Sequence, residues 1–323
     1  MGEAGNSADS VMPGLSGERT GLFLVHCIAG RTTLALTVLL AQALAGAPSG
    51  GAQVAATDDL GRQLRLPAAP TRIVSLVPAV TEILYALGAG KSVAGRSAWD
   101  DQPPEVVSVP SVGDALRPDA ERVLARDPDL VILYAGPDNA RSVDQFDRLE
   151  VAALAIRIDD LEDLRRNILR LGRLVERDSA ADSLWASIRS ELDAVAAATR
   201  DLPRIRVYYD VAWPPAITVG AGSYLDTLLT VAGGENIFHD LAAPSPQVSL
   251  EAIVSRSPEL ILLPAGLERG AADPSTRPGW SVIPAVRQGR TRLVDAGLLH
   301  RLGPRIGHAA RSLAEVLHPG LIP

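Results

Sequence analysis

Two glutamates occupy matching positions in the two halves of the sequence. Glu121 lies in DAERVLARDPDLVIL and Glu251 lies in SLEAIVSRSPELILL, and the acidic, apolar, arginine and proline positions of these segments coincide at a constant offset of 130 residues. Each glutamate comes early in a predicted helix, seven residues before a proline. If the two halves fold alike, both carboxylates face the same side and could bind arginines of a two-subunit partner, because charge complementarity orients such complexes. An acidic residue also stabilises a helix N-terminus by about 0.3 to 1 kcal/mol, so a structural role is the alternative.

The sequence contains none of the common catalytic motifs. We find no Gly-x-Ser-x-Gly elbow, no P-loop, no His-Glu-x-x-His and no Rossmann glycine fingerprint after a predicted strand. The histidines of the main body form no His-x-His or His-x-x-x-His pair, which argues against a zinc site; they are His239, His300, His308 and His318. His300 could still ligate the metal of a haem or corrinoid through its imidazole, or lie at the rim of a cleft. We therefore predict a protein that is not an enzyme and has no catalytic residues, no metal site and no cofactor.

Composition and charge narrow the class of protein further. The 323 residues carry a net charge of -7 and are 47% hydrophobic, which suits a folded protein of two domains. Acidic and basic residues are interspersed, and no run of lysines or arginines could form the basic patch that nucleic acids require, so we predict no nucleic-acid partner. The single cysteine, Cys27, excludes an internal disulfide.

The N-terminal fifty residues have the features of a targeting segment. Arg31 precedes an apolar run at 34–47, LALTVLLAQALAGA, which is too short to span the roughly 30 Å hydrocarbon core of a membrane as a helix. Small residues at 43–45 fit an Ala-x-Ala cleavage site, so residues 1–50 are predicted to be a leader with a signal peptide. A buried N-terminal helix is the alternative. Cys27 precedes the apolar run and follows His26, which is a poor context for lipid attachment, so we expect a periplasmic or otherwise extracytoplasmic protein without a lipid anchor.

After the leader, short β-rich runs alternate with helical patterns, which indicates α/β layers with parallel sheets. A hairpin is expected to turn at Gly61, and residues 161–200 are persistently helical with an interruption expected only at Gly172. Together with the repeat, this pattern predicts two similar Rossmann-like α/β lobes joined by a single long helix. We assign an N-terminal lobe to 57–160, a helical segment with the interlobe helix to 161–200 and a C-terminal lobe to 201–323. The alternative is that helix-proline-strand is simply a common α/β module.

Several blocks of the sequence resemble a known family. RIVSLVPAVTEILYALGAG, DPDLVIL, GGENIF, PSPQVSLEAIVSRSPELIL and GPRIGHAARSL, in this order, are similar to the class III solute-binding proteins of ABC importers for iron complexes and cobalamin. The resemblance covers roughly residues 58–318, and GGENIF followed by PQVSLE is its most specific part. It implies a monomeric clamshell that holds a small molecule between its lobes and delivers it to a permease dimer with ATPase subunits. In the family a glutamate on each lobe engages arginine pockets of the permease, and these positions fall on Glu121 and Glu251.

The resemblance is greatest to the cobalamin-binding members and implies that the ligand is cobalamin or a related corrinoid; the alternative is haem or a ferric siderophore. Such clefts are lined by aromatic side chains, of which Trp99 matches one, while other aromatic positions fall on Ala115, Ile217 and Ser245. Arg301 matches a family arginine that reaches the cleft, and the acidic position shortly before it is Gly297. Trp213 could lie near the mouth and compensate for the missing rings. The structural alternatives are that Trp99 packs a lobe and that Arg301 forms a salt bridge.

Two hypotheses from other classes of protein are alternatives to ligand capture. A metal-cluster enzyme built from similar lobes should carry cluster-binding cysteines, and the sequence has none after Cys27. A scaffold or sensory pair of lobes that binds no ligand remains the other alternative.

Overall fold

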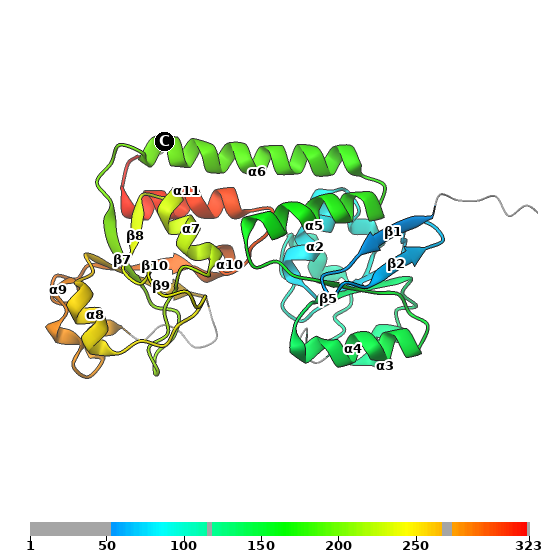
Figure 1. The fold of residues 1–323 in the computed structure, drawn as a ribbon, viewed down its shortest axis with the longest axis horizontal. Coiled ribbons are helices and arrows are strands. Elements are labelled where there is room, and N and C mark those ends of the chain that lie inside the picture. Colours follow the sequence, from blue (N-terminus) through cyan, green and yellow to red (C-terminus); the bar gives the residue numbers. More distant parts are fainter. Residues whose placement is uncertain (1–52, 115–117, 267–272, 322–323) are drawn as a thin grey trace, which may run out of the picture. The chain divides into compact units, whose positions relative to one another are not determined.

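The computed structural model describes residues 53–114, 118–266 and 273–321. The predicted leader with Cys27 and the cleavage site, as well as Ala115, lie outside the described residues. The folded body forms a compact unit, Ala52–Pro323, and Figure 1 shows its helices and strands. In the part of the chain that the structure describes, no helix is both long and apolar enough to cross a membrane.

The N-terminal lobe is built on a four-stranded parallel sheet in the order β4-β3-β5-β6. Its strands are β3 (Ile73–Ser75), β4 (Val93–Arg96), β5 (Leu130–Tyr134) and β6 (Ala153–Ile156). The central strands are buried on both faces, as expected for parallel strands covered by helices. The connecting helices are α2 (Pro78–Ala86), α3 (Ala120–Leu124) and α4 (Pro137–Arg148), with short 3-10 turns at Gly90–Ser92 and Pro104–Ser108.

The C-terminal lobe repeats this topology. Its parallel sheet has the order β10-β9-β7-β8, which from the other edge is β8-β7-β9-β10, that is, second, first, third and fourth strand as in the N-terminal sheet. The strands are β7 (Ile205–Tyr209), β8 (Gly234–Asn236), β9 (Leu260–Ala265) and β10 (Thr291–Asp295). The helices are α7 (Tyr224–Val231), α8 (Leu250–Arg256), α9 (Pro284–Arg287), α10 (Ala296–Leu299) and α11 (Ile306–Leu317), with 3-10 turns at Pro274–Thr276 and Trp280–Val282. The predicted fold class, two α/β lobes with parallel sheets, is confirmed.

Two helices connect the sheets, α5 (Leu161–Leu174) and α6 (Asp178–Thr199). The interruption expected at Gly172 is wrong: Gly172 lies inside α5, and the helix ends after Leu174. A Cβ on Gly172 would come within 2.5 Å of the Cβ of Ala181. Glycine is therefore needed for the close approach of α5 and α6, and not for a break. At about 1.5 Å per residue, the 22 residues of α6 extend about 33 Å, and α6 packs against both α5 and α11.

Buried apolar side chains form three clusters. The largest joins one face of both sheets to α5, α6 and α11, so the lobes share a continuous apolar core on that side. Separate clusters lie on the opposite face of each sheet, one beneath α3 and α4 and one around α8 and α9. The lobes are therefore linked by packing as well as by the connecting helix.

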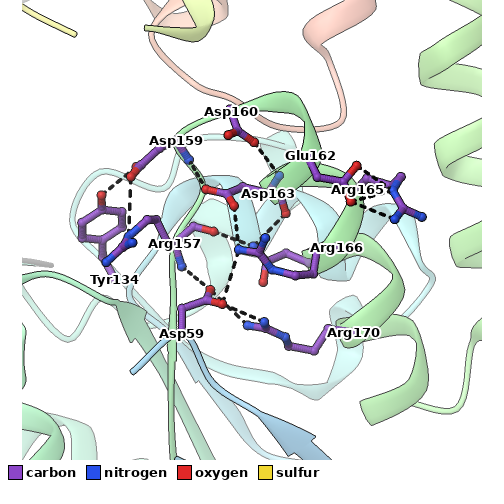
Figure 2. Close-up of polar contacts among 11 residues, drawn as sticks. Asp59, Tyr134, Arg157, Asp159, Asp160, Glu162, Asp163, Arg165, Arg166 and Arg170 are labelled. Atoms are coloured by element: carbon purple, nitrogen blue, oxygen red, sulfur yellow. Dashed lines mark hydrogen bonds and ion pairs between the residues drawn. The ribbon is translucent and has the colours of Figure 1, made fainter. Parts of the chain in front are cut away.

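A hairpin precedes the N-terminal sheet. Its strands, β1 (Val54–Thr57) and β2 (Gln63–Leu66), pair antiparallel. The turn passes through Gly61 at a φ of 81°, as predicted, because glycine adopts this left-handed conformation readily. Asp59 ties the hairpin to the lobe: its carboxylate accepts hydrogen bonds from the backbone N–H of Arg157 and from the guanidinium groups of Arg166 and Arg170 (Figure 2).

Candidate functional site

The predicted site residues follow the carboxyl ends of the parallel strands. In open α/β sheets ligands bind beyond these ends, where the direction of strand succession reverses. Trp99 follows β4, Arg301 follows β10 and α10, and Ile217 follows β7. Ser245 lies on the segment between β8 and α8. The secondary structure thus places these four residues on the loops where a ligand site is expected.

The structure brings the predicted residues together as two separate groups. Trp99 and Arg301 are in contact, because Arg301 Nη2 donates to the Trp99 carbonyl oxygen at 3.1 Å. Ile217 and Ser245 belong to the second group: Ile217 forms isolated β-bridges to Ala212 and Gln247, two residues after the exposed Ser245. Ala115 lies outside the described residues. The binding of a ligand by these residues stays a prediction.

Arg301 lies in an ion network that joins the two lobes. Its Nη1 donates to Glu82 Oε1 at 2.9 Å and to Asp101 Oδ1 at 2.6 Å. Arg305 donates to the same carboxylate, from Nε to Oε2 at 2.9 Å and from Nη2 to Oε1 at 2.8 Å. Both carboxylates come from the N-terminal lobe and both arginines from the C-terminal lobe. Charge-assisted hydrogen bonds of this kind are among the stronger polar contacts in proteins.

Glu82 is the central residue of this network, and it is not among the site residues predicted from the sequence. Its side chain is 5% exposed and accepts hydrogen bonds from both arginines. The signal was present as a single acidic residue within the apolar helix TEILYALGAG, together with two arginines around Gly-Pro near residue 303. A buried carboxylate requires a cationic partner, so these features could have suggested the pairing. Beside it lies a cavity of about 320 Å³, lined by residues that include Tyr85, Gln102 and Pro304.

The loop that carries Trp99 is held by a buried aspartate. The backbone N–H and the hydroxyl of Ser97 donate to Asp100 Oδ2 at 2.7 and 2.5 Å. Burial raises the pKa of Asp100, although hydrogen bonds from Ser97 and Thr81 and the charge of Arg301 act in the opposite direction. Trp99 itself is 56% exposed. The loop therefore presents a large aromatic surface to solvent on a well-braced backbone.

The C-terminal lobe contains a second buried ion pair near the carboxyl end of β7. Arg277 donates to Asp210 at 2.5 Å, and both side chains are 2% exposed. The Arg277 guanidinium lies 4.4 Å from the ring centroid of Trp280 and 5.4 Å from that of Trp213. Trp213 also packs edge-on against Trp280 at 5.0 Å. Its ring is thus partly buried in the core of its own lobe, and the suggestion that it compensates for missing aromatics at a cleft mouth gains no support.

His300 is hydrogen-bonded to the C-terminal lobe through Tyr209, whose side chain packs in a different core cluster from Trp280 and Trp213. Its Nε2 lies 2.8 Å from the hydroxyl of Tyr209, the last residue of β7. Burial lowers the pKa of His300, so the imidazole is neutral at pH 7. Among the described residues, no group of three or more histidine, cysteine, aspartate or glutamate side chains could hold a metal ion.

Glu121 and Glu251 occupy the same position in equivalent helices. Each is the second residue of its helix, α3 or α8, and each of these helices precedes the third strand of its sheet. The capping residues differ, since Asp119 accepts from Glu121 N at 3.0 Å, whereas Ser249 accepts from Ala252 N at 3.2 Å. Both glutamates are exposed, and within the described ranges neither forms a salt bridge. Backbone N–H groups and Ser249 lower the pKa of Glu251, as expected at a helix N-terminus.

Known proteins are similar to this chain in sequence and fold. Residues 73–297 match the family described as periplasmic binding protein. The vitamin B12-binding protein of Vibrio parahaemolyticus is 29% identical over 245 residues, which cover 76% of this chain and 88% of that protein. An uncharacterized ABC transporter substrate-binding lipoprotein of Bacillus subtilis, YvrC, is 32% identical over 77% of this chain and 81% of its own length. The apo form of the periplasmic haem-binding protein RhuT of Roseiflexus is 26% identical with a TM-score of 0.68, covering 77% of this chain and 98% of that chain.

Proposed function

The chain belongs to the periplasmic binding protein family, and from this premise we propose that it captures a corrinoid, cobalamin or a close relative, and delivers it to an ABC permease. One observation carries the proposal: Trp99 and Arg301 come from different lobes, the side chain of Trp99 is exposed, and the Arg301 guanidinium donates to the Trp99 carbonyl oxygen at the carboxyl ends of the strands. An aromatic face beside a cation suits a large, flat ligand with polar edges. The name of the Vibrio relative supports cobalamin as the ligand class. No bond is made or broken in this function.

Titration of the purified mature chain tests ligand capture. We expect cobalamin or cobinamide to quench tryptophan fluorescence saturably and to co-elute with the protein with its corrin absorbance. Trp99→Ala should weaken binding about tenfold or more, since stacking on an exposed aromatic ring contributes roughly 1 to 3 kcal/mol. Trp185→Ala on α6 is the matched control, because it removes a partly buried tryptophan away from the strand ends. Saturable binding that is equally strong in Trp99→Ala would contradict the assignment of Trp99.

A haem or ferric siderophore ligand is the second candidate. It is favoured by the similarity to the Roseiflexus haem-binding protein and by His300, whose imidazole is neutral and partly exposed. Haemin produces a Soret band that shifts on binding, and a siderophore binds only when loaded with iron, so absorbance separates both from a corrinoid. Tight haemin binding without corrinoid binding would establish this candidate in place of the first, and no response to any of these ligands would favour a scaffold.

Delivery to the permease is assigned to the exposed pair Glu121 and Glu251. Replacing both by arginine should leave ligand affinity unchanged and abolish uptake, because the two positive charges would face the arginine pockets expected on the permease dimer. The matched control replaces two other exposed acidic residues, Asp144 and Asp182, by arginine. Normal uptake by the Glu121→Arg, Glu251→Arg variant would refute this role.

We propose the export route on the basis of the same family. Periplasmic binding proteins act outside the cytoplasm, and the N-terminal 50 residues supply the proposed signal peptide. The Bacillus relative is a lipoprotein, whereas here the single cysteine precedes the apolar run. Mass spectrometry of the secreted chain should therefore give an N-terminus after Ala45 with no lipid. A diacylglyceryl mass on a mature N-terminal Cys27 would overturn this proposal.

A further inference from the structure

Arg301 has two acidic partners of very different exposure. Glu82 is 5% exposed and is held by Arg305 as well. Asp101 is 64% exposed and accepts a hydrogen bond from Arg301 Nη1. A buried carboxylate with several charge-assisted hydrogen bonds is costly to displace, whereas an exposed ion pair contributes little. Glu82 is therefore the permanent partner of Arg301, and Asp101 is the exchangeable one.

Arg301, Arg305 and Glu82 need one further anion for charge balance, and Asp101 supplies it. Arg301 and Arg305 contribute two positive charges and Glu82 contributes one negative charge, so these three residues carry a net charge of +1. Asp101 brings this total to zero. Another anionic group that replaced Asp101 would restore the same balance around Arg301, and the displaced Asp101 carboxylate, already 64% exposed, would be solvated.

The backbone places this exchangeable contact beside the predicted aromatic surface. Asp101 comes two residues after Trp99, and the carbonyl of Trp99 accepts from the same guanidinium that Asp101 contacts. A planar ligand stacked on Trp99 would therefore bring its edge close to Arg301. Three of the five N–H donors of a guanidinium are used by Glu82, Asp101 and Trp99, and displacing Asp101 would free one of them for the ligand.

We propose that Asp101 is an internal stand-in for an anionic group of the ligand, with Glu82 as the residue that positions Arg301 to receive it. This inference rests on the proposed ligand capture. It implies that the cleft is selective for a planar ligand that carries a carboxylate or phosphate at its edge. A neutral ligand cannot replace the lost Asp101 contact and is disfavoured. Asp101 therefore sets specificity without contacting the ligand.

The opposite interpretation is that Asp101 is a latch, that is, a residue whose ion pair with Arg301 stabilises the closed cleft. Because Asp101 and Arg301 belong to different lobes, their ion pair could simply favour closure of the cleft. Removal of a latch would weaken the binding of every ligand or leave it unchanged. Removal of a stand-in strengthens binding, and only for ligands that have an anionic edge. The sign of the effect separates the two interpretations.

The test compares Asp101→Asn and Asp101→Ala with wild type in low-salt buffer, by fluorescence titration with three probes. Haemin carries two carboxylates, cobalamin carries a phosphodiester, and dicyanocobinamide carries neither group. Whichever anionic probe the wild type binds, we expect both variants to bind it about two- to fivefold more tightly than the wild type does, the range for release of an exposed ion pair. We expect no gain in affinity for dicyanocobinamide. A gain with haemin alone identifies a carboxylate, and a gain with cobalamin alone identifies a phosphate ester.

Asp144→Asn is the control, since it removes the same charge from an exposed position on α4. An equal gain in this control, an equal gain for dicyanocobinamide, or unchanged or weaker binding in the Asp101 variants would overturn the inference while leaving ligand capture intact. If wild type and both Asp101 variants bind none of the three probes, the proposed function fails and this inference fails with it.

Discussion

Replacement of Asp59 by asparagine would test how the hairpin β1–β2 is attached to the N-terminal lobe. Arg170 donates to the two oxygens of Asp59 at 2.8 and 3.1 Å, Arg166 donates at 3.3 Å and the backbone N–H of Arg157 at 2.6 Å (Figure 2). The side chains of Asp59 and Arg170 are only 11% and 12% exposed. Loss of the carboxylate would leave the Arg170 guanidinium largely buried without an anionic partner.

The magnitude follows from this burial. Removing one partner of a buried ion pair costs about 3 to 5 kcal/mol. Arg166 keeps its 2.6 Å contact with Asp163, and asparagine keeps an oxygen that can accept from the Arg157 backbone. We therefore expect Asp59→Asn to lower the free energy of unfolding by about 2 to 3 kcal/mol. Urea denaturation followed by circular dichroism measures this change, and faster hydrogen exchange in residues 54–66 would locate it.

The pH dependence of stability gives a second, independent test of the Asp59 contacts. Burial acts to raise the pKa of Asp59, but hydrogen bonds from Arg170 and from the Arg157 backbone and the charges of Arg170 and Arg166 outweigh it, and the pKa falls below its ordinary value of 3.8. The unfolded chain then binds the proton more tightly than the folded chain, so this stabilisation is present above 3.8 and is lost as the pH falls through the folded pKa. The difference between wild type and Asp59→Asn should be constant from pH 7 to about 5 and shrink below that. A difference under 0.5 kcal/mol at pH 7, or one that persists undiminished in acid, would refute the reasoning; Asp144→Asn is the control.

Three further changes test other contacts. Glu82→Gln should lower the free energy of unfolding by about 2 to 4 kcal/mol and weaken ligand binding, measured by thermal unfolding and titration; unchanged binding would remove its positioning role. Arg277→Met should cost about 3 to 5 kcal/mol at pH 7 by leaving the buried Asp210 without its cation. Burial already raises the pKa of Asp210 against the effect of Arg277, so Asp210 retains its proton more readily in the folded protein than in the unfolded chain. The loss of unfolding free energy in Arg277→Met should therefore be smaller at pH 4 than at pH 7, as measured by urea titration. Gly172→Ala should destabilise by about 1 to 3 kcal/mol because its Cβ meets that of Ala181 at 2.5 Å, and Ala181→Gly should rescue it; no rescue would place the strain elsewhere.

The sequence was sufficient to predict the fold class because its elements follow local patterns. The apolar runs of β5 and β9 are buried strands, and each strand begins 10 residues after the first residue of a capped helix (Ala120 to Leu130 and Leu250 to Leu260). The repeat between these segments predicted lobes of equal topology, and the strand orders agree. Patterns of this kind depend on neighbouring residues, so they can be recognised without knowledge of tertiary contacts.

The helix break and the ion network show where local patterns are insufficient. Gly172 resembles a helix breaker, yet its role depends on Ala181 in the next helix. Glu82 and Arg301 are separated by 219 residues in the sequence, and nothing near either residue identifies the other as its partner. The contact of Trp99 with Arg301 arises from the same long-range packing. Residues of the candidate site could therefore be proposed from the family resemblance, but their partners could not.

The repeat also explains why the two lobes are alike at some positions and different at others. In the aligned segments TEILYALGAG and LDTLLTVAGG, Glu82 corresponds to Asp226, and both side chains are buried. Asp226 is satisfied within its own lobe, by Asn236 at 2.7 Å and His239 at 2.9 Å, whereas Glu82 is satisfied by arginines of the other lobe.

A symmetric permease dimer would contact two equivalent surfaces, and the exposed Glu121 and Glu251 occupy equivalent positions in their helices. A single ligand bound between the lobes, as proposed, would meet unlike surfaces, and the Glu82 position does differ between the lobes. Equivalence is thus kept where the proposed partner has twofold symmetry and is lost where the proposed ligand has none. Exchanging the two helix residues by Glu82→Asp with Asp226→Glu should consequently impair ligand binding through Arg301 while leaving docking through Glu121 and Glu251 unaffected.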